Sequence, residues 1–348
     1  MPETANESGK RTTLLFALFA GLCVLAAVGY VVWRARSARR TIDGPAPSAI
    51  AASAPEIVAM RAAPHLYFRS AVAGPTFGTV AVASLGQDTA RLTTPLKCDR
   101  VHFAHGHGIC LVDQRAKIHP PAIGILFDAE FHTLHTLDLA GVPSRARISP
   151  DGRYAVTTVF TTGDSYTSGA STRTTIFDAE SGATVEELER FAITREGKPF
   201  REVDFNFWGV TFAKDSNRFY ATVASGERTY LLEGDVAART AKVLRDNAEC
   251  PSLSPDGAHI AFKKRMPNGA WRLHALDLAT MKEWPLPETR NVDDQVEWLD
   301  DAHVLYQVIG ERGLPEVALN VWVSDATEGA SAEPTLYVHS ASSPAVVR

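Results

Sequence analysis

The amino-acid sequence predicts an all-β protein, a six-bladed β-propeller preceded by a single N-terminal transmembrane helix. Three observations support this prediction. An uncharged apolar stretch runs from residue 12 to residue 33. The region from residue 55 onward consists of short runs rich in β-branched and aromatic residues, separated by Gly, Asp, Asn and Pro. A turn motif recurs there at intervals of about 45 residues, the size of a propeller blade.

The N-terminal part of the chain divides into a tail, a membrane span and a linker. Residues 1–11 form the tail, and the 22 residues of 12–33 match the roughly 20 that a helix needs to cross a bilayer. A cleavable signal peptide has a shorter apolar region followed by small residues, whereas here Trp33 runs directly into arginines, which favours a retained anchor. Residues 34–54, first basic and then rich in Ala, Pro and Ser, are typical of a linker, and residues 55–348 hold the propeller.

Two signals bear on the side of the membrane that holds the propeller, and they disagree. Lys10 and Arg11 precede the span and four arginines follow it, which by the positive-inside rule favours a cytoplasmic propeller. Cys98 and Cys110 lie within one expected blade, where they could form a disulfide in an oxidising compartment or remain two buried thiols. Cys250 is then expected to be a core thiol.

The repeat is clearest in two Ser-Pro-Asp-Gly turns, Ser149–Gly152 and Ser254–Gly257, each followed by a short strand. Pro fixes φ, Asp bonds back to the backbone and Gly accepts a positive φ, so the motif is expected to be a tight turn and its Asp no catalytic group. The equivalent positions of all copies are Gly106, Asp151, Asp215, Asp256 and Asp301. Their intervals are 45, 64, 41 and 45 residues, which indicates one insertion of about 20 residues.

Four strands per repeat give six blades. The first blade is expected at residues 63–96, with its second and third strands at 79–83 and 90–93. The last blade is expected at residues 292–338, which leaves a C-terminal tail, 344–347, that could help to close the ring.

The repeats resemble those of the TolB-like family of WD-type β-propellers. The resemblance rests on the Ser-Pro-Asp-Gly turns and on strands that end in Leu-Asp-Leu, as in Leu276–Leu278 and Leu137–Leu139, and it covers most of residues 63–338. It implies a binding platform in the cell envelope and therefore an extracytoplasmic propeller on a single-pass membrane anchor. Propellers of prolyl-oligopeptidase-like enzymes carry similar turns, so the resemblance speaks for the fold more than for the function.

The sequence does not predict an enzyme or a cofactor. A serine hydrolase with a propeller would need an α/β domain with a Gly-x-Ser-x-Gly elbow. Gly163–Thr167 lacks the second Gly of that motif, and no α/β domain follows the repeats.

No metal site is expected either. His102, His105 and His107 form the densest histidine group, but the expected turn separates His105 from His107. The acidic pairs at 293–294 and 300–301 occupy consecutive positions, which point to opposite faces of a strand.

The better candidates lie where the innermost strand of each blade starts, near one mouth of the central channel. Counting seven residues back from each turn position selects Asp99, Ser144, Trp208, Glu249 and Asp294. Three acids and a Trp would suit a cationic or polar partner, with Trp208 as a rigid apolar anchor. The alternative is that Trp208 packs between blades and that Arg100 and Arg145 neutralise the acids internally.

The insertion supplies a second candidate. We place it in the third blade, where residues 161–172 are polar and contain glycine, the composition of a recognition loop, with Asp164 and Tyr166 as partner-binding residues. A hairpin extension without a ligand is the alternative.

The sequence therefore favours a membrane-anchored, non-enzymatic propeller that binds a protein or peptide partner in cell-envelope assembly or transport. The alternative is a propeller enzyme or sensor with a divalent ion at the channel mouth, acting on a small molecule or glycan. A net charge of -5 spread over both signs argues against nucleic acid as the partner. Nothing in the sequence indicates an oligomeric state.

Overall fold

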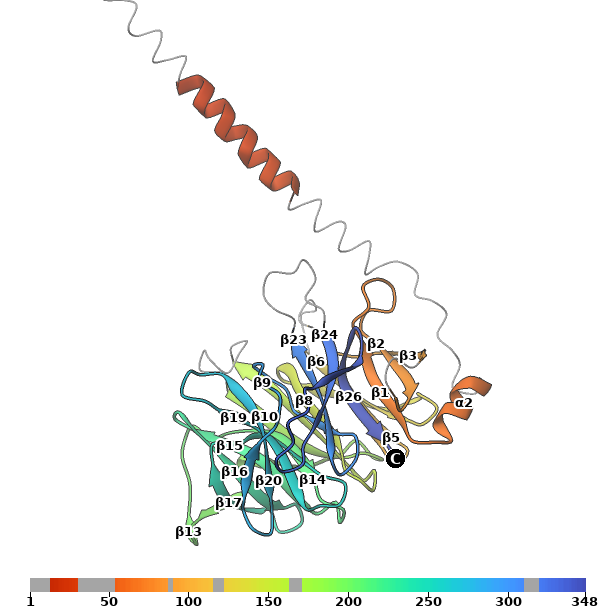
Figure 1. Ribbon diagram of the computed structural model, residues 1–348, viewed down its shortest axis with the longest axis vertical. Coiled ribbons are helices and arrows are strands. Elements are labelled where there is room, and N and C mark those ends of the chain that lie inside the picture. The colour runs from red at the N-terminus through yellow and green to blue at the C-terminus, as the bar shows by residue number, and fades with distance from the viewer. Residues whose placement is uncertain (1–12, 31–53, 87–89, 115–121, 163–170, 310–318) are drawn as a thin grey trace, which may run out of the picture. The chain divides into compact units, whose positions relative to one another are not determined.

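The computed structural model describes residues 13–30, 54–86, 90–114, 122–162, 171–309 and 319–348. Residues Thr13–Tyr30 form an apolar helix of 18 residues, long enough and apolar enough to cross a membrane (Figure 1). Signal sequences near an N-terminus have the same properties, so the helix is confirmed and its retention as an anchor stays a prediction.

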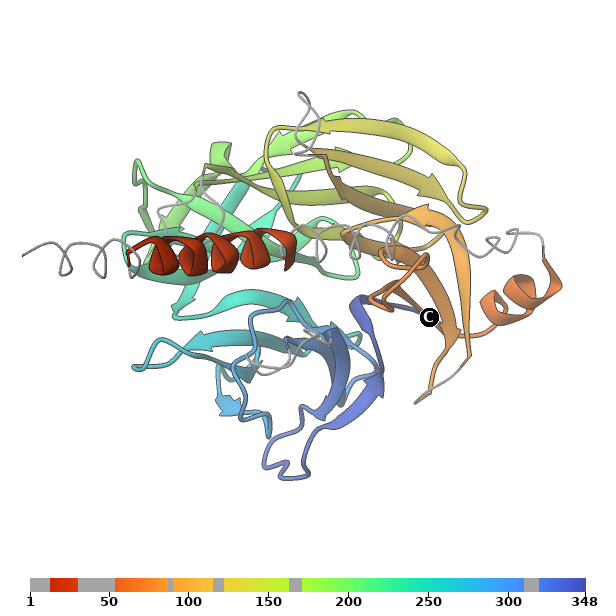
Figure 2. The same ribbon diagram turned by 90° about the horizontal axis from the view of Figure 1, so that it is seen from above.

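Most of the remaining described residues form six sheets, the blades of a propeller, as the sequence predicts (Figure 2). From the inner strand outward, blade 1 is β26 (Ala341–Val347), β1 (His65–Ser70), β2 (Thr79–Ser84) and β3 (Arg91–Lys97); blade 2 is β4 (Arg100–Ala104), β5 (His107–Asp113), β6 (Ala122–Asp128) and β7 (Thr133–Leu139); blade 3 is β8 (Val142–Ile148), β9 (Tyr154–Thr162), β10 (Ser171–Asp178) and β11 (Thr184–Glu187). Blade 4 is β14 (Asn206–Phe212), β15 (Arg218–Ser225), β16 (Arg228–Asp235) and β17 (Thr240–Asp246), extended by β12 (Ala192–Arg195) and β13 (Lys198–Pro199); blade 5 is β18 (Glu249–Leu253), β19 (His259–Arg265), β20 (Trp271–Asp277) and β21 (Glu283–Pro285); blade 6 is β22 (Glu297–Trp298), β23 (His303–Ile309), β24 (Leu319–Asp325) and β25 (Thr335–Val338).

Six apolar clusters make up the core, one between each pair of neighbouring blades. Successive side chains of a strand point to opposite faces of its sheet, so one strand serves two clusters. In β9, Ala155 packs in the cluster between blades 2 and 3, and its neighbour Val156 packs in the cluster between blades 3 and 4. A strand inside a blade, such as β9, therefore buries apolar residues on both faces.

The C-terminal strand closes the ring. β26 pairs antiparallel with β1, with His65 opposite Val347, and the inner strands contact one another in the order β26, β4, β8, β14, β18, β22 and back to β26. The expectation for the C-terminal tail is thus confirmed. The expected strand order of blade 1 is wrong by one position, because β1 is its second strand and the innermost place belongs to β26.

The Ser-Pro-Asp-Gly segments form the tight turns that the sequence predicts. Ser149 Oγ donates to Asp151 Oδ1 at 2.7 Å, and Gly152 has a φ of 77°. These turns also join neighbouring blades, because the Asp256 N–H donates to Asp301 Oδ1 at 2.8 Å. The repeat therefore contributes to the ring as well as to each hairpin.

The main insertion lies between blades 3 and 4, not where the sequence analysis placed it. Residues 188–205 connect β11 to β14 through a 3-10 turn, Leu188–Arg190, and the strands β12 and β13. β12 pairs parallel with β17 and adds to the outer edge of blade 4. Spacing between turn positions counts both the hairpin and the connection between blades, so it could not tell the two apart.

A short helix, α2 (Pro55–Arg61), precedes β1 and was not predicted (Figure 2). Its seven residues are too few to show helical periodicity. The fully buried Ile57 belongs to the cluster between blades 1 and 2. The segment assigned to the propeller from residue 55 therefore begins with this helix rather than with a strand.

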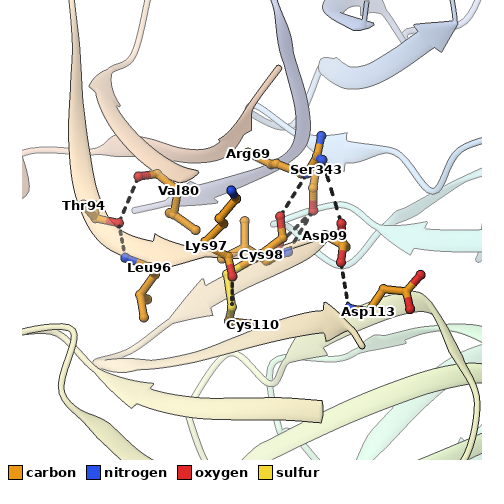
Figure 3. Close-up of a disulfide and its surroundings, with 11 residues drawn as sticks. Arg69, Val80, Thr94, Leu96, Lys97, Cys98, Asp99, Cys110, Asp113 and Ser343 are labelled. Atoms are coloured by element: carbon orange, nitrogen blue, oxygen red, sulfur yellow. Dashed lines mark hydrogen bonds and ion pairs between the residues drawn. A yellow bond between two sulfur atoms is a disulfide. The ribbon is translucent and has the colours of Figure 1, made fainter. Parts of the chain in front are cut away.

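Cys98 and Cys110 form a disulfide, with their Cα atoms 5.4 Å apart (Figure 3). Cys98 lies in the connection from blade 1 to blade 2, and Cys110 lies in β5 of blade 2. Of the two readings that the sequence left open, the structure has the disulfide. Cys250 is buried and free, as expected.

Candidate functional site

The five residues predicted for the channel mouth all lie in or just before inner strands, and their role in binding a partner stays a prediction. Four of them, Ser144, Trp208, Glu249 and Asp294, are buried, and the side chain of Asp99 is 44% exposed. Within the described residues, Trp208 and Glu249 line a common groove.

This groove lies where β14 and β18 start and has a volume of about 1030 Å³. Its walls come from the segment before β14, the β15–β16 hairpin, and the ends of β10 and β19. The charged residues that line it are Asp204, Glu227, Arg228, Asp246, Glu249 and Arg265. Four carboxylates thus face two guanidinium groups, and the groove carries a negative excess. Val203, fully exposed, stands at its rim.

Trp208 forms part of the groove wall rather than a protruding anchor. Its side chain is buried, at 4% exposure, although it lines the groove. The burial agrees with the interpretation that Trp208 packs within the ring of blades, and its role as an anchor for a partner stays a prediction.

Glu249 is held in place by neighbours in blade 5. Glu249 Oε1 accepts a hydrogen bond from Trp271 Nε1 at 3.1 Å and lies 3.8 Å from Arg265 Nε. Lys263 Nζ and Arg265 Cζ lie 4.5 Å and 3.8 Å from the centre of the Trp271 ring, as in cation–π contacts. The carboxylate is rigid and partly compensated before any partner arrives.

Asp99 and Asp294 serve the fold. Asp99 Oδ2 accepts the Asp113 N–H at 2.7 Å, and Arg69 Nη2 lies 3.8 Å from its other oxygen (Figure 3). Asp294 Oδ2 accepts the Gln307 N–H at 3.1 Å. Neither residue lines the groove, so of the three acids only Glu249 belongs to its lining.

The aspartate that buried cations neutralise at this mouth is Asp293, which was not among the predicted acids. Asp293 forms an ion pair with the buried Lys263, and Arg145 Nη2 lies 4.0 Å from the same oxygen. Burial disfavours the ionised form, but these two cations together hold the pKa of Asp293 below its ordinary value. The charge of Arg100, which donates to the carbonyl oxygen of Ser144 at 2.8 Å, also lowers the pKa of Asp293.

The two loop residues, Asp164 and Tyr166, lie outside the described residues. For the histidines, the structure confirms that the turn at the junction of β4 and β5 separates His105 from His107. Within the described residues, no group of three His, Cys, Asp or Glu side chains is placed to hold a metal ion.

A second cavity, of about 630 Å³, lies at the opposite end of the inner strands, where the turns are. All six inner strands contribute to its wall. This cavity was not predicted, although the register of the repeats contains its lining residues. Counting four residues back from each turn position, instead of seven, selects His102, Arg147, Thr211, Ser252 and Glu297, and all five line this cavity.

The polar groups of this cavity centre on an ion pair between Arg147 and Glu297, both buried. Arg147 also donates to Ser252 Oγ at 3.2 Å and to the Val296 carbonyl oxygen at 2.7 Å. The Val346 N–H donates to Glu297 Oε1 at 3.2 Å. Strands β8, β18, β22 and β26 are thereby joined across the channel.

These contacts set the charges of two buried groups. Burial opposes ionisation of Glu297, but the charge of Arg147 and the neighbouring His102 lower the pKa of Glu297 to about 2. Burial lowers the pKa of His102, so its imidazole is neutral at pH 7. His102 Nδ1 accepts the Ile148 N–H at 3.1 Å, which leaves the proton on Nε2, 3.8 Å from Glu297 Oε2.

No protein-family model and no curated protein matches this chain. The fold is similar to that of TolB from Acinetobacter baumannii, with a TM-score of 0.55 and 14% identity over 82% of this chain and 67% of that one. It is also similar to a chain of a nidogen/laminin complex, with a TM-score of 0.56 and 11% identity over 82% of this chain and 98% of the other. At these identities the similarities show the propeller fold alone, which confirms the TolB-like resemblance for architecture.

Proposed function

We propose that this protein is a single-pass, membrane-anchored propeller without enzymatic activity that binds a protein or peptide partner in the cell envelope. The groove that Trp208 and Glu249 line carries the proposal. A partner segment with Lys or Arg side chains suits its negative excess, and an apolar side chain of the partner suits Trp208 and Val203 at its wall and rim.

The disulfide supports an extracytoplasmic position. Structural disulfides persist in oxidising compartments and are rare in the cytosol. The Cys98–Cys110 bond therefore outweighs the modest difference in positive charge across the apolar helix. The apolar helix at Thr13–Tyr30 then serves as the anchor.

Site-specific photo-crosslinking in cells tests the binding role. A photoreactive phenylalanine at Val203, on the groove rim, is expected to capture one discrete protein. The same residue at Leu134, exposed on β7 away from the groove, is the matched position and should not capture it.

Charge reversal then tests the groove itself. Glu227→Lys changes an exposed carboxylate of the groove and should weaken binding of the captured protein about tenfold, more at low salt than at high salt. Glu328→Lys, an exposed carboxylate outside the groove, is the control. Equal binding by both variants, or equal capture from both positions, would refute the groove as the binding site.

A separate measurement tests which side of the membrane holds the propeller. An alkaline phosphatase fused after Arg348 should be active if the propeller is extracytoplasmic. The fusion must follow β26, because an earlier junction would remove the strand that closes the ring. An inactive fusion that is present at normal levels would contradict the proposed location.

A further inference from the structure

The cavity at the turn end of the channel has a charge imbalance opposite to that of the groove. Arg147, Lys214 and Arg348 line it, and Glu297 is the acidic residue of its lining. The oxygens of Glu297 already receive Arg147 and the Val346 N–H, so its charge is matched within the protein. Two cationic side chains, Lys214 and Arg348, therefore remain in excess over the acids of the lining.

The rest of the cavity wall is apolar and well held. Phe212, Leu253, Trp298 and Val346 belong to it. Trp298 Nε1 donates to the Ser252 carbonyl oxygen at 2.8 Å, which fixes the plane of the indole ring. Arg348 also donates to the Trp298 carbonyl oxygen. An apolar wall beside cations that outnumber the acids of the lining is complementary to a molecule with an apolar body and one negative charge.

Arg147, at the buried end of the cavity, is occupied by the protein itself. Arg147 Nε is buried and has no hydrogen-bond partner among the described residues. The other nitrogens of this guanidinium group are occupied by Glu297, Ser252 and the Val296 carbonyl oxygen. Arg147 is therefore committed to contacts within the protein, and its buried Nε is not accessible from the cavity, so the ligand's charge must be met by other residues.

We infer that this cavity binds a small carboxylate with an apolar body, its carboxylate directed to Arg348 and Lys214. Arginine and carboxylate form charge-assisted hydrogen bonds, and a volume of about 630 Å³ lies within the range of small-molecule sites. The site is at the other end of β14 and β18 from the groove and does not depend on the proposed partner. Free acids and the C-terminal carboxylate of a short peptide share this chemistry.

Calorimetric titration of the full-length protein in detergent tests the inference. The probes are 4-phenylbutyrate and 4-phenylbutylamine, which share the apolar body and differ in the sign of charge. The carboxylate is expected to bind with a Kd below about 1 mM and the amine at least about tenfold more weakly. Equal affinity of the two probes, or no binding of the carboxylate to folded protein, would overturn the inference.

Variants of the cavity residues distinguish binding of the probe in the cavity from its uptake into detergent micelles. Lys214 and Arg348 are exposed, so the double variant Lys214→Gln/Arg348→Gln is expected to fold and to bind 4-phenylbutyrate at least about tenfold more weakly. Lys282→Gln, an exposed lysine outside the cavity, should leave binding unchanged. Unchanged affinity of the double variant would refute the site.

Two further titrations complete the design. The tripeptide acetyl-Phe-Val-Leu with a free carboxylate, compared with its C-terminal amide, identifies the source of the carboxylate. Tighter binding of the peptide acid than of 4-phenylbutyrate assigns the site to peptide ends, and the reverse order assigns it to small acids. Glu227→Lys in the groove should leave 4-phenylbutyrate binding intact. Loss of ligand binding in the cavity can therefore be told apart from loss of partner binding in the groove.

Discussion

Arg147 of β8 and Glu297 of β22 form an ion pair across the channel although 150 residues separate them in the chain. Both side chains are buried, and strands from blades 3 and 6 meet at this contact. A buried pair of this kind stabilises little compared with apolar residues of similar volume, but loss of one partner leaves an uncompensated charge. The pair therefore ties the folded state to the correct arrangement of blades on opposite sides of the ring.

Replacing one residue of this pair should change the free energy of unfolding more than replacing both. Arg147→Met or Glu297→Leu alone should lower the free energy of unfolding by about 3 to 5 kcal/mol, because each leaves the other charge buried and unpaired. The double variant should recover most of that loss. Urea denaturation followed by tryptophan fluorescence measures all three, and additive losses in the double variant would show that the two residues do not act as a pair.

The lowered pKa of Glu297 makes the stability that this pair contributes depend on pH. Because the folded-state pKa of Glu297, about 2, lies below its ordinary 4.5, its ionised form stabilises the fold above about pH 4.5. This contribution, about 3 kcal/mol, is lost as the pH falls from 4.5 toward 2. The stability difference between wild type and Glu297→Gln should therefore be constant from pH 5 to 7 and shrink below pH 4.5. A difference that stays constant down to pH 2.5 would contradict the assignment.

Removal of the disulfide should destabilise the propeller. Cys98 and Cys110 close a loop with a sequence separation of 12, so Cys98→Ala/Cys110→Ala should lose about 3 kcal/mol. Reductant should lower the stability of the wild type by a similar amount and leave the variant unchanged, since Cys250 takes part in no disulfide. Alkylation under non-reducing conditions provides an independent check, because it should spare these two cysteines.

Closure by β26 predicts a sharp contrast between two identical substitutions. Ala345 is fully buried between blades 1 and 2, so Ala345→Asp should lower the free energy of unfolding by at least about 3 kcal/mol. Ala332→Asp, at an exposed position between β24 and β25, should change it by less than about 0.5 kcal/mol. Chemical denaturation of both variants decides this, and equal stability would mean that the C-terminal strand is dispensable.

The insertion between blades 3 and 4 should behave as part of the core. Ile193 of β12 is 3% exposed and packs with the cluster between these blades, so Ile193→Ala should cost about 2 to 5 kcal/mol. Val203→Ala changes a fully exposed apolar residue of the same insertion and should be nearly neutral. A small effect at Ile193 would instead indicate that the added strand is not packed against blade 4 in solution.

The fold was largely accessible from the sequence because its signals are local. A Ser-Pro-Asp-Gly turn is specified by the conformational preferences of four adjacent residues, and strand alternation is specified within five or six. Repetition of these signals determined six blades, their approximate limits and a β-rich domain after an apolar helix. The helix α2 was missed since seven residues carry too little periodicity, and the insertion was misplaced since its two possible positions give the same spacing.

The sites depended on contacts between distant residues, and only the tertiary structure decided them. The register of the repeats placed Trp208 and Glu249 at a channel mouth, and the structure brings both to one groove, but Asp99 and Asp294 turn to backbone N–H groups instead. The same register, read three residues further along each strand, contains His102, Arg147 and Glu297, yet nothing local distinguishes an arginine in a channel from one at a surface. Closure of the ring by β26 and the pairing of Arg147 with Glu297 exist only once all six blades are assembled, because each joins residues that no local preference relates.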